Sequence, residues 1–81
     1  MSMLYVLLHK SQDGTEIVSI SRNLISTTKE LVNHYRDRLN IFLSEEIQET
    51  SFQSDLPYAE IVVDDETEWW QVMPYKEADI K

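Results

Sequence analysis

The chain has 81 residues, of which 42% are hydrophobic, and a formal net charge of −8 at pH 7. This length has room for one hydrophobic core, so we expect a single domain over residues 1–81. The negative charge disfavours contact with nucleic-acid phosphates and with anionic membranes, and no run of residues is apolar enough to span a bilayer. Cysteine is absent, which removes disulfides and thiolate metal sites. These features favour a cytoplasmic protein.

The first half of the chain predicts a β-hairpin. Residues 3–9 are almost continuously apolar, so a strand here has apolar side chains on both faces and belongs inside a sheet. Asp13 and Gly14 form a pair that tolerates positive φ and favours a tight turn. Residues 15–21 then provide the returning strand.

One long helix is expected over residues 26–49, because apolar side chains recur there every three or four positions. Thr27 and Glu30 have the spacing of a capping box, so we expect Thr27 to cap the first turn. Asn40 can take the left-handed conformation that ends a helix, and Ser44 is suited to begin another. We therefore expect a bend or break between Asn40 and Ser44.

The second half predicts a loop and two further strands. Residues 50–57 are polar and predict the loop, and residues 58–63 and 68–73 predict strands joined by a short acidic turn. Pro74 cannot donate a backbone hydrogen bond, which suits an edge strand. Residues 74–81 are expected to form a polar, mobile tail.

The expected elements follow the order strand, strand, helix, strand, strand. This order predicts an α+β domain with a four-stranded, mainly antiparallel sheet. The most apolar strand should lie inside and hairpin partners should be neighbours, which favours the spatial order 2-1-3-4. The helix, continuous or broken, covers one face. A helix broken into two antiparallel pieces would make the third strand run parallel to the first. Either way, the sheet has more apolar side chains than one helix can cover, so we expect an open apolar surface.

The pair Trp69 and Trp70 is the clearest candidate for that surface. Neighbouring residues in a strand point to opposite faces, so only one of the two indoles can contact the helix, and the sequence leaves open which one does. The outward indole either packs over surface neighbours or contacts another chain, because Trp is enriched at interface hot spots. We expect it to join a partner-binding patch with Tyr5, Met73 and Tyr75, and we expect Leu7 to share the same uncovered face.

Four carboxylates form the densest acidic segment of the chain, and we expect them to form the charged rim of this patch. They are Asp64, Asp65, Glu66 and Glu68. Their spacing is not that of a calcium-binding loop, and no glycine lies at the bend, so we expect a solvated turn without a metal.

No catalytic or cofactor-binding residue is predicted. His9 and His34, the two histidines, are expected to be ordinary surface residues. No spacing brings together a nucleophile, a base and an orienting group, and the single glycine excludes a glycine-rich phosphate loop.

The leading prediction is a small acidic, non-enzymatic domain that binds another protein, which includes a second copy of itself, through an open sheet face or an edge strand. Direct contact with nucleic acid or with a membrane is not expected. The first alternative is an acidic inhibitor or nucleic-acid mimic that occupies a basic protein surface. The chain resembles inhibitors of phages and toxin-neutralising proteins in size and charge only. The second alternative is a regulatory domain that binds a small ligand.

Overall fold

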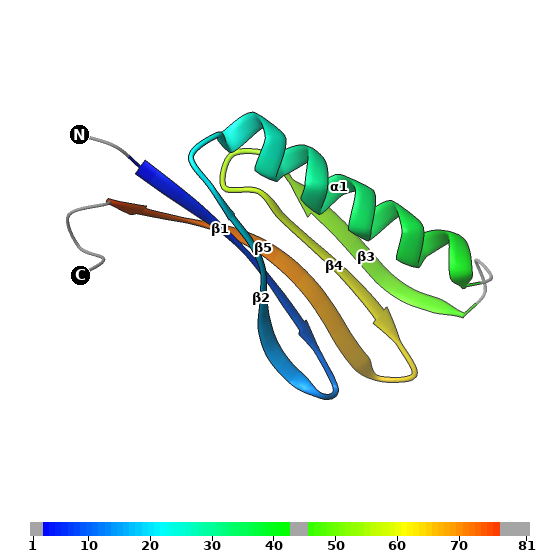
Figure 1. Cartoon of the computed structure of the whole chain (residues 1–81). Coiled ribbons are helices and arrows are strands. Elements are labelled where there is room, and N and C mark those ends of the chain that lie inside the picture. The colour runs from blue at the N-terminus through cyan, green and yellow to red at the C-terminus, as the bar shows by residue number, and fades with distance from the viewer. Residues whose placement is uncertain (1–2, 43–45, 77–81) are drawn as a thin grey trace.

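The computed structural model describes residues 3–42 and 46–76. The elements in chain order are β1 (Met3–Ser11), β2 (Gly14–Ser21), α1 (Leu24–Ile41), β3 (Ile47–Gln53), β4 (Tyr58–Val63) and β5 (Glu66–Lys76). The strands form one five-stranded sheet in the order β2-β1-β5-β4-β3, and every neighbouring pair is antiparallel. Helix α1 lies along one side of this sheet (Figure 1). The predicted α+β class and antiparallel sheet are confirmed.

The predicted number and order of strands are wrong. Residues 47–53, expected to end the helix and begin a loop, form the edge strand β3. Five of its seven residues are exposed, so polar side chains are tolerated there. The segment therefore lacks the apolar alternation by which a strand is recognised in the sequence. Helix α1 carries the chain from one edge of the sheet at β2 to the other edge at β3. Strands β4 and β5 then fill the sheet inwards, so β5 lies between β1 and β4.

Helix α1 begins at Leu24, and its cap lies four residues earlier than expected, because Asn23 and not Thr27 caps it. The Asn23 side chain accepts a hydrogen bond from the Ser26 amide at 3.1 Å. Thr27 is 1% exposed inside the first turn, where its hydroxyl donates to the Asn23 carbonyl at 2.8 Å. Glu30, the expected second member of the capping box, accepts instead from the Ser19 hydroxyl on β2 at 2.9 Å.

The helix ends at Ile41, and Phe42 is already extended, with φ −91° and ψ 145°. This end falls in the interval between Asn40 and Ser44 where a bend or break was expected, although residues 43–45 lie outside the described part of the chain. A second helical piece is not found after it, because β3 follows. Within the described residues, no helix is long and apolar enough to cross a membrane.

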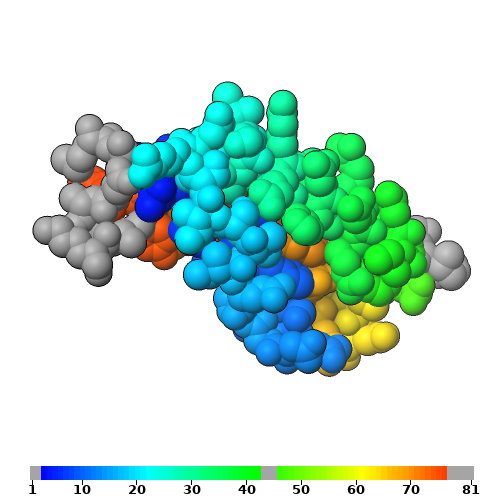
Figure 2. Space-filling view, viewed as in Figure 1, coloured from blue at the N-terminus to red at the C-terminus, as the bar shows by residue number. Residues whose placement is uncertain are grey.

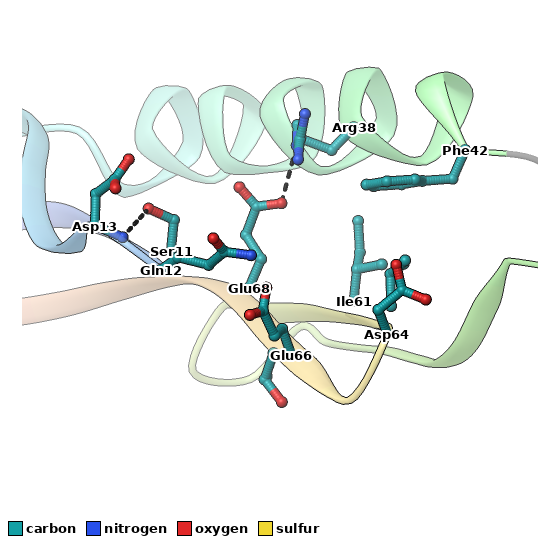
Figure 3. Close-up of a pocket in the computed structure, with 11 residues that line it drawn as sticks. Ser11, Gln12, Asp13, Arg38, Phe42, Ile61, Asp64, Glu66 and Glu68 are labelled. Atoms are coloured by element: carbon teal, nitrogen blue, oxygen red, sulfur yellow. Dashed lines mark hydrogen bonds and ion pairs between the residues drawn. The ribbon is translucent and has the colours of Figure 1, made fainter.

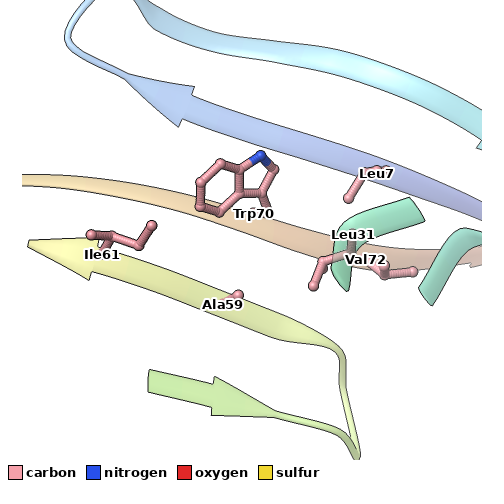
Figure 4. Close-up of a cluster of buried hydrophobic side chains, with 6 residues drawn as sticks. All are labelled: Leu7, Leu31, Ala59, Ile61, Trp70 and Val72. Carbon is pink, nitrogen blue, oxygen red and sulfur yellow. The ribbon is translucent and has the colours of Figure 1, made fainter. Parts of the chain in front are cut away.

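The core lies between α1 and the three strands β1, β5 and β4 (Figure 4). Trp70 is 2% exposed at its centre, and the edge of its ring meets Tyr35 of α1 at 6.2 Å between ring centroids. Trp70 is therefore the indole that faces the helix. The buried apolar cluster consists of Leu7, Leu31, Ala59, Ile61, Trp70 and Val72.

Pro74 lies inside β5, opposite Tyr5 of β1, and β5 is an interior strand of the sheet, so the expectation of an edge strand is wrong. Its surroundings explain why a proline is tolerated. The Val72 amide donates to the Pro57 carbonyl at 2.9 Å, and beyond this point β5 has β1 as its one described neighbour. The expected tail is also shorter, because β5 continues to Lys76, and residues 77–81 lie outside the described part of the chain.

Candidate interaction surface and acidic cleft

The register of the sheet determines which side chains face away from the helix. Residues directly opposite each other in antiparallel strands share a face, and neighbours along a strand alternate. Leu7 and Trp70 belong to the helix side, so Val6 and its partners Ile20 and Met73 point to the other side. No described element covers that side, which we name the open face (Figure 1). Its apolar members by this register are Leu4, Val6, Leu8, Ile17, Ile20, Tyr58, Val62, Trp69, Met73 and Tyr75.

The open face is divided into an apolar half and a more polar half. The apolar half lies on β2, β1 and β5, where Val6 is 7% exposed among its neighbours while Ile20 is 58% and Tyr75 40% exposed. The polar half lies on β4 and β3, where Glu60 is opposite Ser51. Contiguous apolar area on one half and hydrogen-bonding groups on the other are the features of a protein-binding surface.

Trp69 lies at the border of the two halves. Its ring centroid is 6.1 Å from that of Tyr58, which is two strand positions before Glu60 on the same face. The Tyr58 hydroxyl donates to Glu60 Oε2 at 3.4 Å, and the Ser51 hydroxyl donates to Glu60 Oε1 at 3.1 Å. Burial, the negative charge of Glu60 and this hydrogen bond, in decreasing order, raise the pKa of Tyr58 above its usual 10.0. The phenol therefore stays neutral beside the indole at any physiological pH.

The structure brings some of the predicted patch residues together and separates others. Trp69, Met73 and Tyr75 share the open face. Leu7 is fully buried on the helix side, and Tyr5 packs against the same core, so neither lies on the uncovered face where we expected it. The first strand is apolar on both sides, and only its register with β5 decides which side meets the helix. For the same reason the sequence did not identify Leu4, Val6, Leu8 and Ile20 as members of the patch.

The predicted acidic residues lie at one end of the sheet and do not surround the open face. Asp64 and Asp65 form the two-residue turn between β4 and β5, with φ values of 54° and 62°. Asp residues tolerate this left-handed conformation. Glu66 and Glu68 are opposite Val63 and Ile61, which puts both carboxylates on the helix side.

Glu68 joins the helix to two strands. Its Oε1 accepts from Arg38 Nε at 2.9 Å, and its Oε2 is 2.5 Å from His9 Nε2. The other ring nitrogen of His9 is 3.3 Å from Glu16 Oε1, and the imidazole stacks on Trp70 at 5.0 Å between ring centroids. The His9 side chain is only 18% exposed, so it is not the ordinary surface residue that we expected. Its main partner is 59 residues away in the chain, and no local pattern indicates such a pair.

A cleft of about 400 Å³ lies between the end of α1 and the two hairpin turns (Figure 2). Phe42 and Ile61 form its apolar side, and the carboxylates of Asp13, Asp64 and Glu66 lie around it (Figure 3). Arg38 spans one side through its ion pair with Glu68, and its guanidinium is 5.1 Å from the Phe42 ring centroid. The cleft is therefore acidic, with its one guanidinium already paired.

A second cleft of about 410 Å³ lies on the other side of the Arg38–Glu68 pair and includes His9, His34 and Trp70. His34 Nε2 is 4.0 Å from Glu30 Oε2, one helical turn away. Within the described residues, no three His, Asp or Glu side chains are grouped to hold a metal ion, and no buried side-chain nitrogen or oxygen lacks a hydrogen-bond partner. Among the described residues, the polar side-chain atoms that are buried beside the two clefts are thus all hydrogen-bonded.

The fold and its surfaces define a class: a two-layer α+β domain in which one helix covers one face of an antiparallel sheet and the other face is open. No protein-family model, curated protein or solved structure matches the chain. Function is therefore inferred from the chemistry of the open face and the clefts.

Proposed function

We propose that this chain is a non-enzymatic protein-interaction domain that binds its partner through the open face. The observation that carries the proposal is the apolar half of that face, which no described element covers. Each apolar side chain moved from water into an interface contributes about 1.5–3 kcal/mol. Ile20 is more than half exposed at 58%, and it adjoins Val6 at the centre of the apolar half. Contiguous apolar surface of this kind is typical of a site that another protein covers.

The two clefts support a structural role for their polar groups. A general base or nucleophile needs a reactive atom directed at a substrate. Both oxygens of Glu68 are instead engaged by Arg38 and His9, and both ring nitrogens of His9 face carboxylates. These contacts join α1 to the strands, which favours binding over catalysis.

The experiment compares two variants that add the same charge at exposed isoleucines. Ile20→Asp changes the open face, whereas Ile25→Asp changes a residue of α1 that is 69% exposed. The tagged wild type and both variants are incubated with lysate of the cells that express the chain, and bound proteins are quantified by mass spectrometry. We expect the bound partner, including untagged copies of this chain, to be lost with Ile20→Asp and retained with Ile25→Asp. Equal binding by both variants, with circular dichroism showing that both are folded, would contradict the proposal.

A second candidate is an acidic inhibitor that occupies a basic protein surface, and the acidic cleft supports it. Asp13, Asp64 and Glu66 bring three carboxylates from two hairpin turns to one end of the molecule. Charge reversal by Asp64→Lys together with Glu66→Lys should abolish such binding, while Ile20→Asp should leave it intact. Because exposed charges are screened at high ionic strength, the remaining affinity in about 1 M salt measures how much of the interface is packed.

A further inference from the structure

We infer that the occupant of the open face is a second copy of this chain, stacked so that each strand lies antiparallel over its own counterpart. The inference rests on the proposed function, because it names the partner of the same surface. It is carried by the size of the face, by the position of its apolar half and by the distribution of charge between the two ends of the sheet.

The open face has the size that a stable dimer needs. Strands lie about 4.8 Å apart, so five strands of roughly 25 Å present a flat area on the order of 600 Å². Side chains standing on the sheet increase the accessible area towards the ~800 Å² that each partner contributes to an interface of standard size. That is about a seventh of the 5694 Å² of the chain. Two such faces together form a β-sandwich with about 10 Å between the sheets.

The apolar half lies off-centre, and this limits how two copies can stack. It occupies β2, β1 and β5, while β4 and β3 carry polar groups such as Glu60 and Ser51. A two-fold axis that lies between the sheets and runs across the strands puts each strand over its own copy in reverse. The apolar half of one copy then packs against the apolar half of the other. Each contact occurs twice, as in an isologous dimer.

The charges favour the same axis. The turn end of the sheet carries Asp13, Asp64, Asp65 and Glu66, with Lys10 nearby on the open face, whereas Lys76 at the opposite end of β5 is paired with Met3 and lies on the helix side. A two-fold axis along the strands would put the two acidic ends together. The axis across the strands keeps the two acidic turn ends at opposite ends of the stack, so these like charges do not meet.

The association is tested by sedimentation velocity on the full chain between about 1 µM and about 1 mM. We expect a monomer–dimer equilibrium in the wild type. Ile20→Asp should raise the dimer dissociation constant by roughly 100-fold or more, because each dimer contains the substitution twice. Ile25→Asp, which adds the same charge outside the open face, should leave the constant within about threefold. A dimer that is equally sensitive to both substitutions would overturn the inference.

The orientation is tested by crosslinking, since the chain has no cysteine and an introduced thiol is unique. Gln71 and Thr67 both lie on the open face, at the middle and at the acidic end of β5. In the reversed stack, copies of Gln71→Cys lie near the two-fold axis and should be joined by a bismaleimide of about 10 Å, the separation of stacked sheets. Copies of Thr67→Cys should lie roughly 30 Å apart and remain unlinked. Efficient crosslinking of Thr67→Cys and not of Gln71→Cys would overturn the reversed arrangement.

The two experiments separate failure of the dimer from failure of the proposed function. If the wild type is a monomer at every concentration but Ile20→Asp still loses a cellular partner, the inference that a second copy binds the open face is wrong. The proposal that the open face is an interaction surface is then retained. If neither association nor partner binding depends on Ile20, both are overturned. If a dimer forms that Ile20→Asp does not weaken, the interface lies elsewhere, such as at an edge strand, and the inference is wrong.

Discussion

Glu68 is the residue at which three distant parts of the chain meet. Arg38 comes from the helix and His9 from the first strand, and both bind the one carboxylate, which is 16% exposed. A carboxylate that loses most of its water is stabilised only if charged or polar partners replace that water. The network therefore holds the end of α1 against the sheet beside the acidic cleft.

The first prediction tests this network. Arg38→Met removes the cation but keeps an apolar stem over Phe42, so Glu68 loses one of its two partners. We expect the free energy of unfolding to fall by about 1–2 kcal/mol, a value kept small because Arg38 is itself 41% exposed. Urea unfolding followed by circular dichroism measures it. Arg36→Met, an exposed arginine on the same helix, is the control and should change stability by less than about 0.5 kcal/mol. Equal losses in the two variants would contradict the prediction.

A second prediction concerns Tyr58 at alkaline pH. Because its pKa is raised in the folded chain by burial, by the charge of Glu60 and by their hydrogen bond, the fold favours the protonated phenol. This contribution to stability is fully present below about pH 10 and is lost as pH rises through the folded pKa. Tyr58→Phe should therefore remove part of the fall in the urea midpoint above about pH 10. The difference in ultraviolet absorption titration between wild type and Tyr58→Phe isolates this phenol.

Glu60→Gln is the matched variant for Tyr58, because it removes the negative charge, the second cause of the shift, and leaves burial and an amide oxygen that can still accept from the phenol. The Tyr58 titration should then move towards its usual value without reaching it. An unchanged titration in Glu60→Gln would show that Glu60 does not act on the phenol.

At the scale of the elements, the third prediction concerns the start of α1. Asn23→Ala removes the side-chain acceptor for the Ser26 amide and should lower stability by about 1 kcal/mol, whereas Asn23→Asp keeps the acceptor and should retain it. Thermal and urea unfolding measure both variants. If Asn23→Asp lost as much stability as Asn23→Ala, the side chain would not act as the cap.

Local sequence signals predicted the elements that local interactions form. The β1–β2 hairpin forms where Asp13 and Gly14 predicted it, although Gln12 and Asp13 make the turn and Gly14, with φ 115°, begins β2. The recurrence of apolar residues every three or four positions predicted the helix up to Ile41. Apolar residues continue at helical spacing through Phe42 and Ile47, so the sequence predicted helix where β3 forms. An edge strand with one covered face also needs only an apolar residue every few positions. At the helix start, the sequence indicated Thr27 as the cap, and the choice of Asn23 over Thr27 depends on how the chain leaves β2.

Strand order and face assignment could not be predicted, because they depend on contacts between residues far apart in the sequence. The sequence showed that Trp69 and Trp70 point to opposite sides, but only the pairing of β5 with β1 puts Trp70 in the core. The same pairing buries Leu7 and leaves Val6 on the open face. The expectation of an uncovered apolar surface needed only a comparison of apolar strand positions with one helix, and it did not depend on the register.

For the whole molecule, the distribution of charge matters more than its sum. Residues 1–40 carry five Lys and Arg and four Asp and Glu, whereas residues 41–81 carry two and eleven. The fold brings acids of both halves, Asp13 and Asp64 among them, to the two turns at one end of the sheet. Two copies with a net charge of −8 each repel at long range. Charge therefore opposes self-association overall while it selects one orientation of the stack.

The fourth prediction separates these two effects. Lys76→Glu adds negative charge at the end of the sheet that the reversed stack brings near the partner's acidic turns, and Arg36→Glu makes the same change of net charge on the exposed side of α1. At about 10 mM salt, where the Debye length is ~30 Å, we expect both variants to dimerise less tightly than wild type and Lys76→Glu to be the weaker by severalfold. Raising the salt to about 150 mM shortens the Debye length to ~8 Å, so the wild-type dimer should tighten as net repulsion is screened. The two variants should then converge, as measured by sedimentation at each salt concentration. If Arg36→Glu weakened the dimer as much as Lys76→Glu at low salt, charge at the ends of the sheet would have no part in orienting the copies.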